Sequence, residues 1–141
     1  MSRPRILVAE ELSPAGLEIL VRACDVEHGD GWTRAELLAR IDGFEGLVVR
    51  SGTKLGADLI DRGERLRIIA RAGVGVDNVD VAAATRRGVV VCNAPQSNVV
   101  SAAEHTIALM LALARNIPQA HASLTGGRWE RSSFSGVELH D

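Results

Sequence analysis

Cysteine is scarce in this sequence of 141 residues, which contains only Cys24 and Cys92. The two thiols form no C-x-x-C pair and have no spacing typical of a metal site. Isolated thiols in a chain of this size indicate a reduced, intracellular protein. The sequence also lacks a charged and then apolar leader, because Met1 is followed almost directly by a strand pattern. We therefore predict a cytoplasmic protein with no metal site.

The sequence has neither a large net charge nor a long apolar run. Its formal net charge is −2, whereas binding to nucleic acid or to an acidic membrane surface needs a basic face. The apolar run over residues 107–114 has eight residues, and a helix that spans a membrane needs about twenty. We therefore predict neither nucleic acid nor a membrane as a partner.

Aromatic residues are also few, since the chain has two Trp, two Phe and no Tyr. The composition as a whole, with 46% hydrophobic and 24% charged residues, is nevertheless typical of a soluble globular protein. A chain of this length can bury a core of its own. These properties predict a folded protein and not a disordered one.

Five short apolar segments alternate with helical patterns in the first hundred residues. The predicted strands are residues 5–9, a short segment at Val26, and residues 46–49, 67–70 and 89–92. Most of these segments are apolar without interruption, which is typical of parallel strands covered by helices on both faces. We therefore predict an α/β fold, a flavodoxin-like doubly wound parallel five-stranded sheet.

Local capping signals predict the helices between these strands. Ser13 and Pro14 suit the start of a helix that runs towards Arg22, because serine caps the first turn and proline fits its first position. Thr33 and Glu36 have the spacing of a capping box. Two helices are therefore expected before the third strand.

Two more helices are predicted around the fourth strand. Residues 57–62 form a short amphipathic segment. Asn78 is expected to cap a helix over residues 79–87. Gly88 is expected to end that helix in the left-handed conformation, which costs glycine little.

The character of the chain changes after residue 97. Residues 98–116 predict one long helix, and residues 118–124 predict a second helix that Gly126 and Gly127 stop. The stretch from 128 to 141 is interpreted as an extended arm. We therefore divide the chain into residues 1–97 and residues 98–141, the latter a long crossover helix with an arm.

Candidate binding residues follow the third, fourth and fifth strands. Ligands of open parallel sheets bind at the carboxyl ends of the strands. Arg50 and Arg71 stand at two of these ends, and their guanidinium groups suit a carboxylate or a phosphate. The alternative is that both are solvated surface charges. Their position after apolar strands favours binding.

The loop from Gly73 to Gly75 is a second candidate for anion binding. Its backbone amides and the start of the next predicted helix would both favour a carboxylate. The alternative is a tight turn without a ligand. A dinucleotide fingerprint is excluded, because Asn78 replaces its third glycine and no acidic residue lies between Asp80 and Glu104.

The sequence offers no catalytic arrangement. Glu104 and His105 are adjacent and so lie about 100° apart on a helix, unlike the i, i+4 pair of a zinc site. The other histidines have no partner at a useful spacing; they are His28, His121 and His140. We therefore predict no catalytic residue and no metal ligand within this chain.

Four motifs resemble the NAD-dependent D-2-hydroxyacid dehydrogenases. They are residues 48–51 (VVRS), 71–80 (RAGVGVDNVD), 93–98 (NAPQSN) and 101–105 (SAAEH). Residues 127–139 (GRWERSSFSGVEL) are most similar to the branch of the family that acts on D-3-phosphoglycerate, the phosphoglycerate dehydrogenases. The resemblance extends over nearly the whole chain.

The resemblance implies that residues 1–97 form a substrate-binding domain for a 2-hydroxy or 2-keto acid. Arg50, Ser51 and Asn98 are implied to contact the substrate, with Arg71 nearby. The amides of the loop from Gly73 to Gly75 are implied to hold its carboxylate. The implied substrate-binding residues are thus Arg50, Ser51, Arg71, Gly73, Val74, Gly75 and Asn98. Val74 is also implied to lie near the NAD cofactor.

The resemblance further implies hydride transfer between NAD and a 2-hydroxy acid. The reaction that it implies first is the oxidation of D-3-phosphoglycerate to 3-phosphohydroxypyruvate in serine biosynthesis. The glycines that bind the cofactor phosphates and the catalytic residues of the family would all lie beyond residue 141. Residues 98–141 would then lead into a nucleotide-binding domain that this chain lacks, and the chain by itself would be inactive. A homo-oligomer through residues 98–141 is also expected.

Three alternatives remain. A signalling receiver domain has a similar sheet and an acidic pair such as Glu10 and Glu11, but it needs an aspartate where this chain has Arg50. A second alternative is a non-catalytic module that binds a small acid or assembles with other copies. The third, within the family, is a dehydrogenase of another 2-hydroxy acid or a reductase of glyoxylate or hydroxypyruvate.

Overall fold

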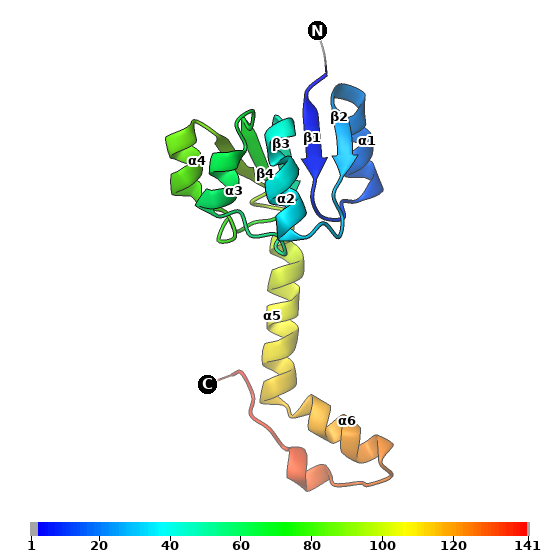
Figure 1. Cartoon of the computed structure of the whole chain (residues 1–141). Helices are drawn as coiled ribbons and strands as arrows, with labels where there is room; N and C mark the ends of the chain where they lie inside the picture. Colours follow the sequence, from blue (N-terminus) through cyan, green and yellow to red (C-terminus); the bar gives the residue numbers. More distant parts are fainter. Residues whose placement is uncertain (1–2, 141) are drawn as a thin grey trace. The chain divides into compact units, whose positions relative to one another are not determined.

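The computed structural model describes residues 3–140 and comprises two compact units, Met1–Ser97 and Asn98–Asp141. Figure 1 shows the helices and strands of each unit. The first unit contains the whole sheet, and the second contains helices only.

The first unit contains five parallel strands in the order β2-β1-β3-β4-β5. The strands are β1 (Arg5–Val8), β2 (Asp25–His28), β3 (Gly46–Val49), β4 (Ile68–Arg71) and β5 (Val90–Asn93). This order and direction confirm the predicted flavodoxin-like α/β fold. Both β4 and β5 are displaced by one residue from the predicted segments, so Arg71 is the last residue of its strand.

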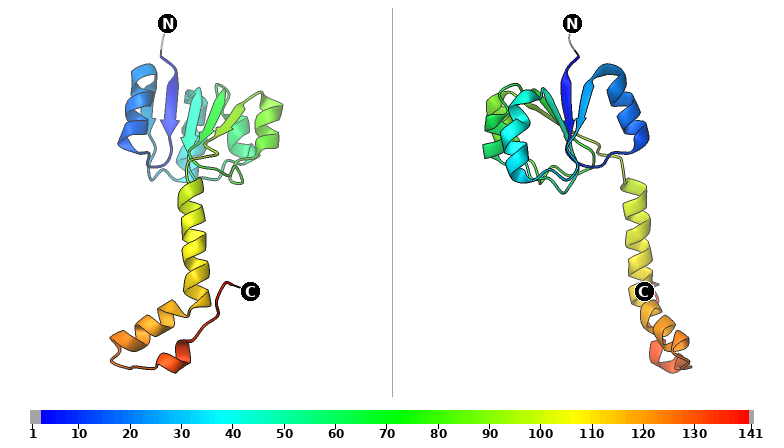
Figure 2. Two further views of the ribbon diagram at one scale, coloured as in Figure 1. Left: turned by 180° about the vertical axis from the view of Figure 1, so that it is seen from behind. Right: turned by 45° about the vertical axis from the view of Figure 1, so that its right-hand side comes forward.

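Helices lie on both faces of this sheet (Figure 2). They are α1 (Pro14–Ala23), α2 (Arg34–Arg40), α3 (Ala57–Arg62) and α4 (Val81–Arg87), with a 3₁₀ turn, η1 (Ile41–Gly43), after α2. Leu7, Leu47 and Ile69 pack in the larger core, with residues of α2, α3 and α4. Ile6, Val8 and Val48 point to the other face and pack with residues of α1. Each such side chain contributes roughly 1.5–3 kcal/mol on full burial.

The face that carries α1 is only partly covered. On that side Ile68 of β4 is 39% exposed and Val90 of β5 is 59% exposed. The prediction of strands covered on both faces is therefore wrong for the outer part of the sheet. The physical reason is that α1 packs over β1 and β3, and the described residues of the first unit supply no second helix for β4 and β5.

The predicted caps of the early helices are confirmed. The Ser13 side chain accepts a hydrogen bond from the Gly16 amide. Thr33 and Glu36 form a complete capping box, in which the Thr33 amide donates to Glu36 Oε2 at 2.7 Å. Gly88 ends α4 with a φ of 68°, as the sequence predicts.

The predicted role of Asn78 is wrong. The helix α4 begins at Val81 and is capped by Asp80, whose Oδ1 accepts from the Ala83 amide at 2.9 Å. Residues 78–80 are not helical because they pair with Leu55: its amide donates to Asn78 O and its carbonyl accepts from the Asp80 amide, both at 2.8 Å. The Asn78 side chain is thereby free for another contact, described below.

The second unit contains α5 (Val99–Ala114), α6 (Ile117–Thr125) and a 3₁₀ turn, η2 (Arg131–Phe134). Both predicted helices are confirmed, and Gly126 and Gly127 follow α6. Among residues 3–140, no helix has both the length and the apolar character needed to cross a membrane.

The predicted extended arm is wrong in part, because much of residues 128–140 folds back. Ser123 in α6 is buried, and its hydroxyl donates to Glu130 Oε2 at 2.7 Å. The Val137 amide donates to the carbonyl of Ala114 at 2.8 Å. These two contacts hold the segment against α6 and the end of α5. The last residue of the predicted arm, residue 141, lies outside the described residues.

Candidate functional site

The loops that follow β3, β4 and β5 begin at one edge of the sheet. Val49, the last residue of β3, is paired with Arg71 of β4. Arg71 is in turn paired with Asn93 of β5. Because parallel strands in this register end at the same level, the loops that follow them leave from the same edge. Arg50 and the loop from Gly73 to Gly75 are thus brought to the carboxyl edge of the sheet.

The first of these loops is held by a residue from another strand. The carboxylate of Glu10, just beyond β1, accepts hydrogen bonds from the amides of Arg50 at 2.8 Å, Gly52 at 3.0 Å and Thr53 at 2.9 Å. Burial raises the pKa of Glu10, but the three amides and the side chain of Thr53 outweigh burial and hold this pKa below its usual value. The carboxylate is therefore ionised at neutral pH.

Asn78 holds the same loop from the other side. Its Nδ2 donates to the carbonyl oxygens of Arg50 and Thr53, each at 2.7 Å. Sequence reasoning missed both Glu10 and Asn78 as parts of the site. It interpreted Glu10 only as one half of an acidic pair and Asn78 only as a helix cap, since neither contact can be recognised from neighbours along the chain.

The side chains of Arg50 and Ser51 project from this fixed loop into solvent, and both residues are exposed. Within residues 3–140, neither side chain makes a hydrogen bond or an ion pair. A cavity of about 500 Å³ lies beside Arg50, lined by Ala72 and by residues 11–14. The guanidinium group of Arg50 is thus available to an anion that enters at this edge.

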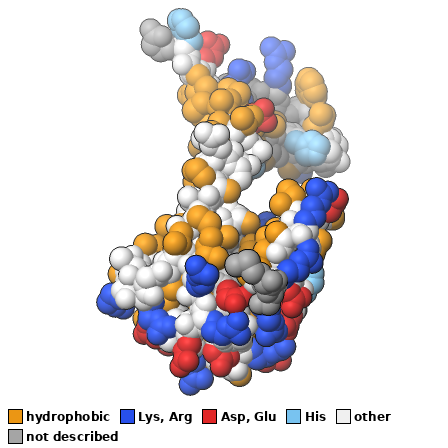
Figure 3. All heavy atoms as spheres, turned by 90° about the horizontal axis from the view of Figure 1, so that it is seen from above, with side chains coloured by type: hydrophobic (Ala, Val, Ile, Leu, Met, Phe, Trp, Pro, Cys, Tyr) orange, Lys and Arg blue, Asp and Glu red, His pale blue; other side chains and the backbone are white. Residues whose placement is uncertain are grey.

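The arginines at the opposite edge are different. Figure 3 looks from above Figure 1, the side on which the strands begin, and shows basic and acidic side chains interspersed there. Arg5 Nη2 lies 2.9 Å from Glu27 Oε2, and Arg65 Nη2 lies 2.7 Å from Glu45 Oε1. These ion pairs occupy their guanidinium groups, whereas Arg50 has no such partner among the described residues.

The second loop is shaped by contacts of glycine backbone. The guanidinium of Arg71 lies against Gly73, where an added Cβ would overlap Nη1 and lie 2.7 Å from Cζ. Asn93 Nδ2 donates to the carbonyl of Val74 at 2.6 Å and so fastens the loop to the end of β5. Arg71 Nε is buried and has no hydrogen-bond partner in the described part of the chain.

The loop offers fewer amides than the sequence suggests. The Gly73 amide donates to the carbonyl of Arg71 at 2.9 Å and is therefore occupied. The amides of Val74 and Gly75 donate to no group among residues 3–140. The expected helix start is also absent from the loop, because α4 begins only at Val81 and is capped by Asp80. Two free amides remain for an anion.

The remaining predicted residues are placed differently. The side chain of Val74 is 39% exposed and apolar at this edge. Asn98 belongs to the second unit, directly before α5, and its side chain caps no amide there. Among residues 3–140, no cluster of three or more His, Cys, Asp or Glu side chains could hold a metal ion.

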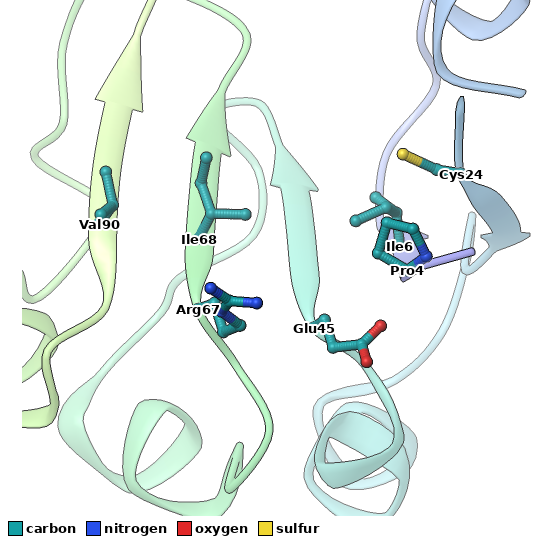
Figure 4. A pocket seen from close by; sticks show the side chains of 7 residues that line it. All are labelled: Pro4, Ile6, Cys24, Glu45, Arg67, Ile68 and Val90. Atoms are coloured by element: carbon teal, nitrogen blue, oxygen red, sulfur yellow. The ribbon is translucent and has the colours of Figure 1, made fainter. Parts of the chain in front are cut away.

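A separate hollow of about 580 Å³ lies on the partly covered sheet face (Figure 4). Ile6, Ile68 and Val90 line its floor, and Glu45 and Arg67 flank it where β3 and β4 begin. None of the predicted binding residues lines it. Its apolar floor belongs to the amino half of the sheet, away from the arginine and amides described above.

The chain is similar to known proteins along almost its whole length. Residues 6–136 match the family described as D-isomer specific 2-hydroxyacid dehydrogenase, catalytic domain. The chain is 52% identical over 136 residues to a D-3-phosphoglycerate dehydrogenase of Methanocaldococcus jannaschii. This match covers 96% of the chain and 26% of that protein. It thus spans about a quarter of the length of such curated relatives.

Solved structures agree with the sequence match. The NADPH-dependent glyoxylate/hydroxypyruvate reductase of Sinorhizobium meliloti, solved with NADP and malonate, has a TM-score of 0.81 and 36% identity, covering 99% of this chain and 44% of that one. The NAD+-bound 3-phosphoglycerate dehydrogenase of Entamoeba histolytica has a TM-score of 0.68 and 28% identity, covering 81% and 40%. The chain therefore belongs to the D-isomer specific 2-hydroxyacid dehydrogenase family, as shown by the family match over residues 6–136, the shared sheet and the motif from Arg71 to Asp80.

Proposed function

We propose that this chain supplies the substrate-binding face of an NAD-dependent D-3-phosphoglycerate dehydrogenase, which oxidises D-3-phosphoglycerate to 3-phosphohydroxypyruvate in serine biosynthesis. The observation that carries this proposal is the guanidinium of Arg50, unpaired among residues 3–140, at the same sheet edge as the amides of Val74 and Gly75, which have no partner there either. A substrate with a carboxylate and a phosphate needs donors of these two kinds. Relatives of this name are about half identical to the chain.

The proposed roles follow from the donors that each group offers. The amides of Val74 and Gly75 bind the substrate carboxylate, and Arg50 binds a second anionic group with Ser51 beside it. Arg71 acts from the other side of the loop, since its guanidinium already lies against Gly73. Asn98 is also proposed as a substrate contact, as its family motif implies.

NAD is the proposed cofactor, which when bound would supply the hydride acceptor for the oxidation at C2 of the substrate. The exposed apolar side chain of Val74 suits contact with a flat ring at this edge. The chain contains no glycine fingerprint for a dinucleotide. We assign the main cofactor site, and the group that takes the hydroxyl proton, to the part of the full-length relatives that this chain does not span.

A second candidate function is the reduction of glyoxylate or hydroxypyruvate, or the oxidation of another 2-hydroxy acid. The similarity to the Sinorhizobium meliloti reductase supports this candidate. The carboxylate site at Val74 and Gly75 would bind either kind of substrate. Only the contact between Arg50 and the phosphate would therefore favour D-3-phosphoglycerate over acids that lack a phosphate. A non-catalytic module that binds a small acid is the third candidate for the isolated chain.

A steady-state assay on the full-length protein that carries this segment tests the proposal. NADH formation is measured with D-3-phosphoglycerate, D-glycerate and D-lactate at matched concentrations. The proposal expects kcat/KM for D-3-phosphoglycerate to exceed the others by about tenfold or more, since a charged hydrogen bond contributes roughly 1.5–3 kcal/mol. Equal values would favour the second candidate, and no binding of any 2-hydroxy acid would overturn the assignment.

We also propose that residues 98–141 form a contact between copies of the chain in the cytoplasm. Leu113 is 79% exposed and Ile107 is 52% exposed in α5, and Trp129 is 78% exposed. Several large apolar side chains exposed within one unit are typical of surfaces that another protein covers. A second copy is the occupant proposed, because most soluble oligomers consist of identical subunits.

A further inference from the structure

The carboxylate of Glu10 binds a loop that is remote from it in the sequence. Its three amide partners, Arg50, Gly52 and Thr53, lie 40, 42 and 43 residues further along the chain. A Cβ added at Gly52 would lie 2.9 Å from Glu10 Oε2, so the backbone approaches the carboxylate closely. Glu10 therefore connects the end of β1 to the turn that follows β3.

The same turn is bound on its acceptor side by Asn78. With Nδ2 at 2.7 Å from the carbonyls of Arg50 and Thr53, these two residues are held at both their amide and their carbonyl. Glu10 takes the donors and Asn78 satisfies the acceptors. A turn held on both sides has little freedom to move. The position of the Arg50 backbone, from which the side chain extends, is therefore restricted.

The arrangement also keeps the charge of Arg50 free. The oxygens of Glu10 face backbone amides and the side chain of Thr53, and in the described part of the chain Glu10 and Arg50 form no ion pair. The carboxylate thus fixes the backbone of Arg50 without neutralising its guanidinium. A group that is held in place but left unpaired is preorganised for an incoming anion.

We propose that Glu10 is a positioning residue for the substrate, which acts by fixing the turn that carries Arg50. This inference rests on the proposed function of the site as one that binds a 2-hydroxy acid. Glu10 does not touch the substrate in this proposal. Its contribution passes through Arg50, so its removal should matter only while Arg50 is present.

A carboxylate is needed at this position because the turn presents only donors to it: three backbone amides and the side chain of Thr53. Glutamine would place an NH2 group where an amide N–H already points, and one of the hydrogen bonds would be lost. Aspartate keeps both acceptor oxygens but is one methylene shorter, so it should restore part of the effect. Glu10→Gln keeps the length of the side chain but loses an acceptor oxygen, whereas Glu10→Asp keeps both acceptors but is shorter. The two variants therefore distinguish the effect of the acceptors from the effect of side-chain length.

Glu45 offers a matched control. Its carboxylate also accepts from a backbone amide of a neighbouring segment, that of Arg5 at 2.7 Å, and its pKa is likewise lowered by that hydrogen bond and by Arg65. It lies immediately before β3, at the opposite edge from Arg50. Glu45→Gln removes a comparable contact without reaching the proposed site.

The experiment is a double-mutant cycle on the full-length protein. KM and kcat for D-3-phosphoglycerate, Kd for NADH and the thermal unfolding midpoint are measured for wild type, Glu10→Gln, Arg50→Ala and the double variant. We expect Glu10→Gln to raise KM about tenfold with Kd for NADH within about twofold of wild type. In the Arg50→Ala background the same substitution should change KM by less than about twofold, because the guanidinium through which Glu10 acts is already absent. Glu10→Asp should recover part of the loss.

Several outcomes would overturn the proposal. Glu10→Gln could leave KM unchanged, or its effect could persist in full without Arg50. Glu45→Gln could raise KM as much as Glu10→Gln does, which would indicate general destabilisation. Should Glu10→Gln not fold, the cycle with Glu10→Asp decides by the same criteria. Wild-type activity with a different 2-hydroxy acid would refute D-3-phosphoglycerate as substrate but not this inference, because the cycle then runs on that acid.

Discussion

The guanidinium of Arg71 lies against the backbone of Gly73 so closely that no side chain fits between them. Gly73 itself has no left-handed backbone, so conformational freedom is not what requires glycine at this position. The requirement comes from the arginine, which crosses the space that a methyl group would fill. Glycine is therefore required at this position because the Arg71 side chain lies against it, and not because the loop needs a flexible residue.

This relationship predicts that Gly73→Ala impairs binding without unfolding the protein. The obstructing atoms belong to the mobile end of Arg71, which can move aside, so stability should change little. The displaced guanidinium should weaken substrate binding about tenfold, the loss of roughly 1.4 kcal/mol of interaction. Titration calorimetry with D-3-phosphoglycerate and thermal unfolding of the full-length protein measure the two effects.

Gly88→Ala provides the reverse case. Gly88 has a φ of 68° and nothing within 4 Å of an added Cβ. The substitution should cost about 1–2 kcal/mol of stability, because alanine is strained in the left-handed region. Substrate affinity of the folded protein should stay unchanged. If Gly73→Ala lowers stability as much as Gly88→Ala, the proposed displacement of Arg71 is wrong.

Arg50→Ala should weaken substrate binding much more than NAD binding. The side chain is exposed, unpaired within the described residues and placed at the edge where the candidate carboxylate site lies. Loss of one charge-assisted contact costs on the order of 1.5–3 kcal/mol, or roughly 10- to 150-fold in affinity. Separate Kd measurements for substrate and for NADH test this, and equal losses would contradict the placement.

The hydrogen bonds of Glu10 predict how stability depends on pH. Burial raises the pKa of this carboxyl, but the amides of Arg50, Thr53 and Gly52 and the side chain of Thr53 more than offset it, so the pKa is lower in the folded than in the unfolded state. Its contribution to stability is therefore fully present above the ordinary pKa of about 4.5 and is lost as the pH falls through the lowered value.

Urea unfolding of wild type and Glu10→Gln between about pH 3 and pH 7 measures this contribution. The difference in free energy of unfolding should be largest near neutral pH and should shrink in acid, because glutamine carries no titrating proton. A difference that stays constant over the whole range would show that the charge of Glu10 contributes nothing to the fold.

The large apolar side chains exposed around α5 predict self-association of the 141-residue chain. Burial of Leu113 alone against a second copy would contribute roughly 1.5–3 kcal/mol. Light scattering at micromolar concentration should detect oligomers, and Leu113→Gln should shift them towards monomer. A monodisperse wild-type monomer with α5 fully protected from hydrogen exchange would refute this.

The purified 141-residue chain should not produce NADH from D-3-phosphoglycerate. Its residues include no fingerprint for the cofactor phosphates and no candidate catalytic base. The same assay on the full-length protein is the positive control. NADH formation above background by the short chain would show that this sequence contains catalytic groups that its motifs do not reveal.

The sequence by itself determined the elements whose signals are local. The capping box of Thr33 and Glu36 spans four residues, and its helix forms as predicted. The alternation of apolar strands with helices was sufficient to predict a parallel sheet, and the positions of Arg50 and Arg71 after two of its strands placed them at the edge where ligands bind.

Only the tertiary structure decided how that edge is built. Asn78 is a residue type typical of helix caps, but it lies in a turn beside the bridge between Leu55 and Val79, and its side chain binds the turn at Arg50. Glu10 meets the same turn across 40 residues of chain. Local propensity acts over about four residues, so contacts of this range depend on strand order and register. The site's arginine could be predicted from its neighbours in the sequence, whereas the residues that hold it could be found only from its neighbours in space.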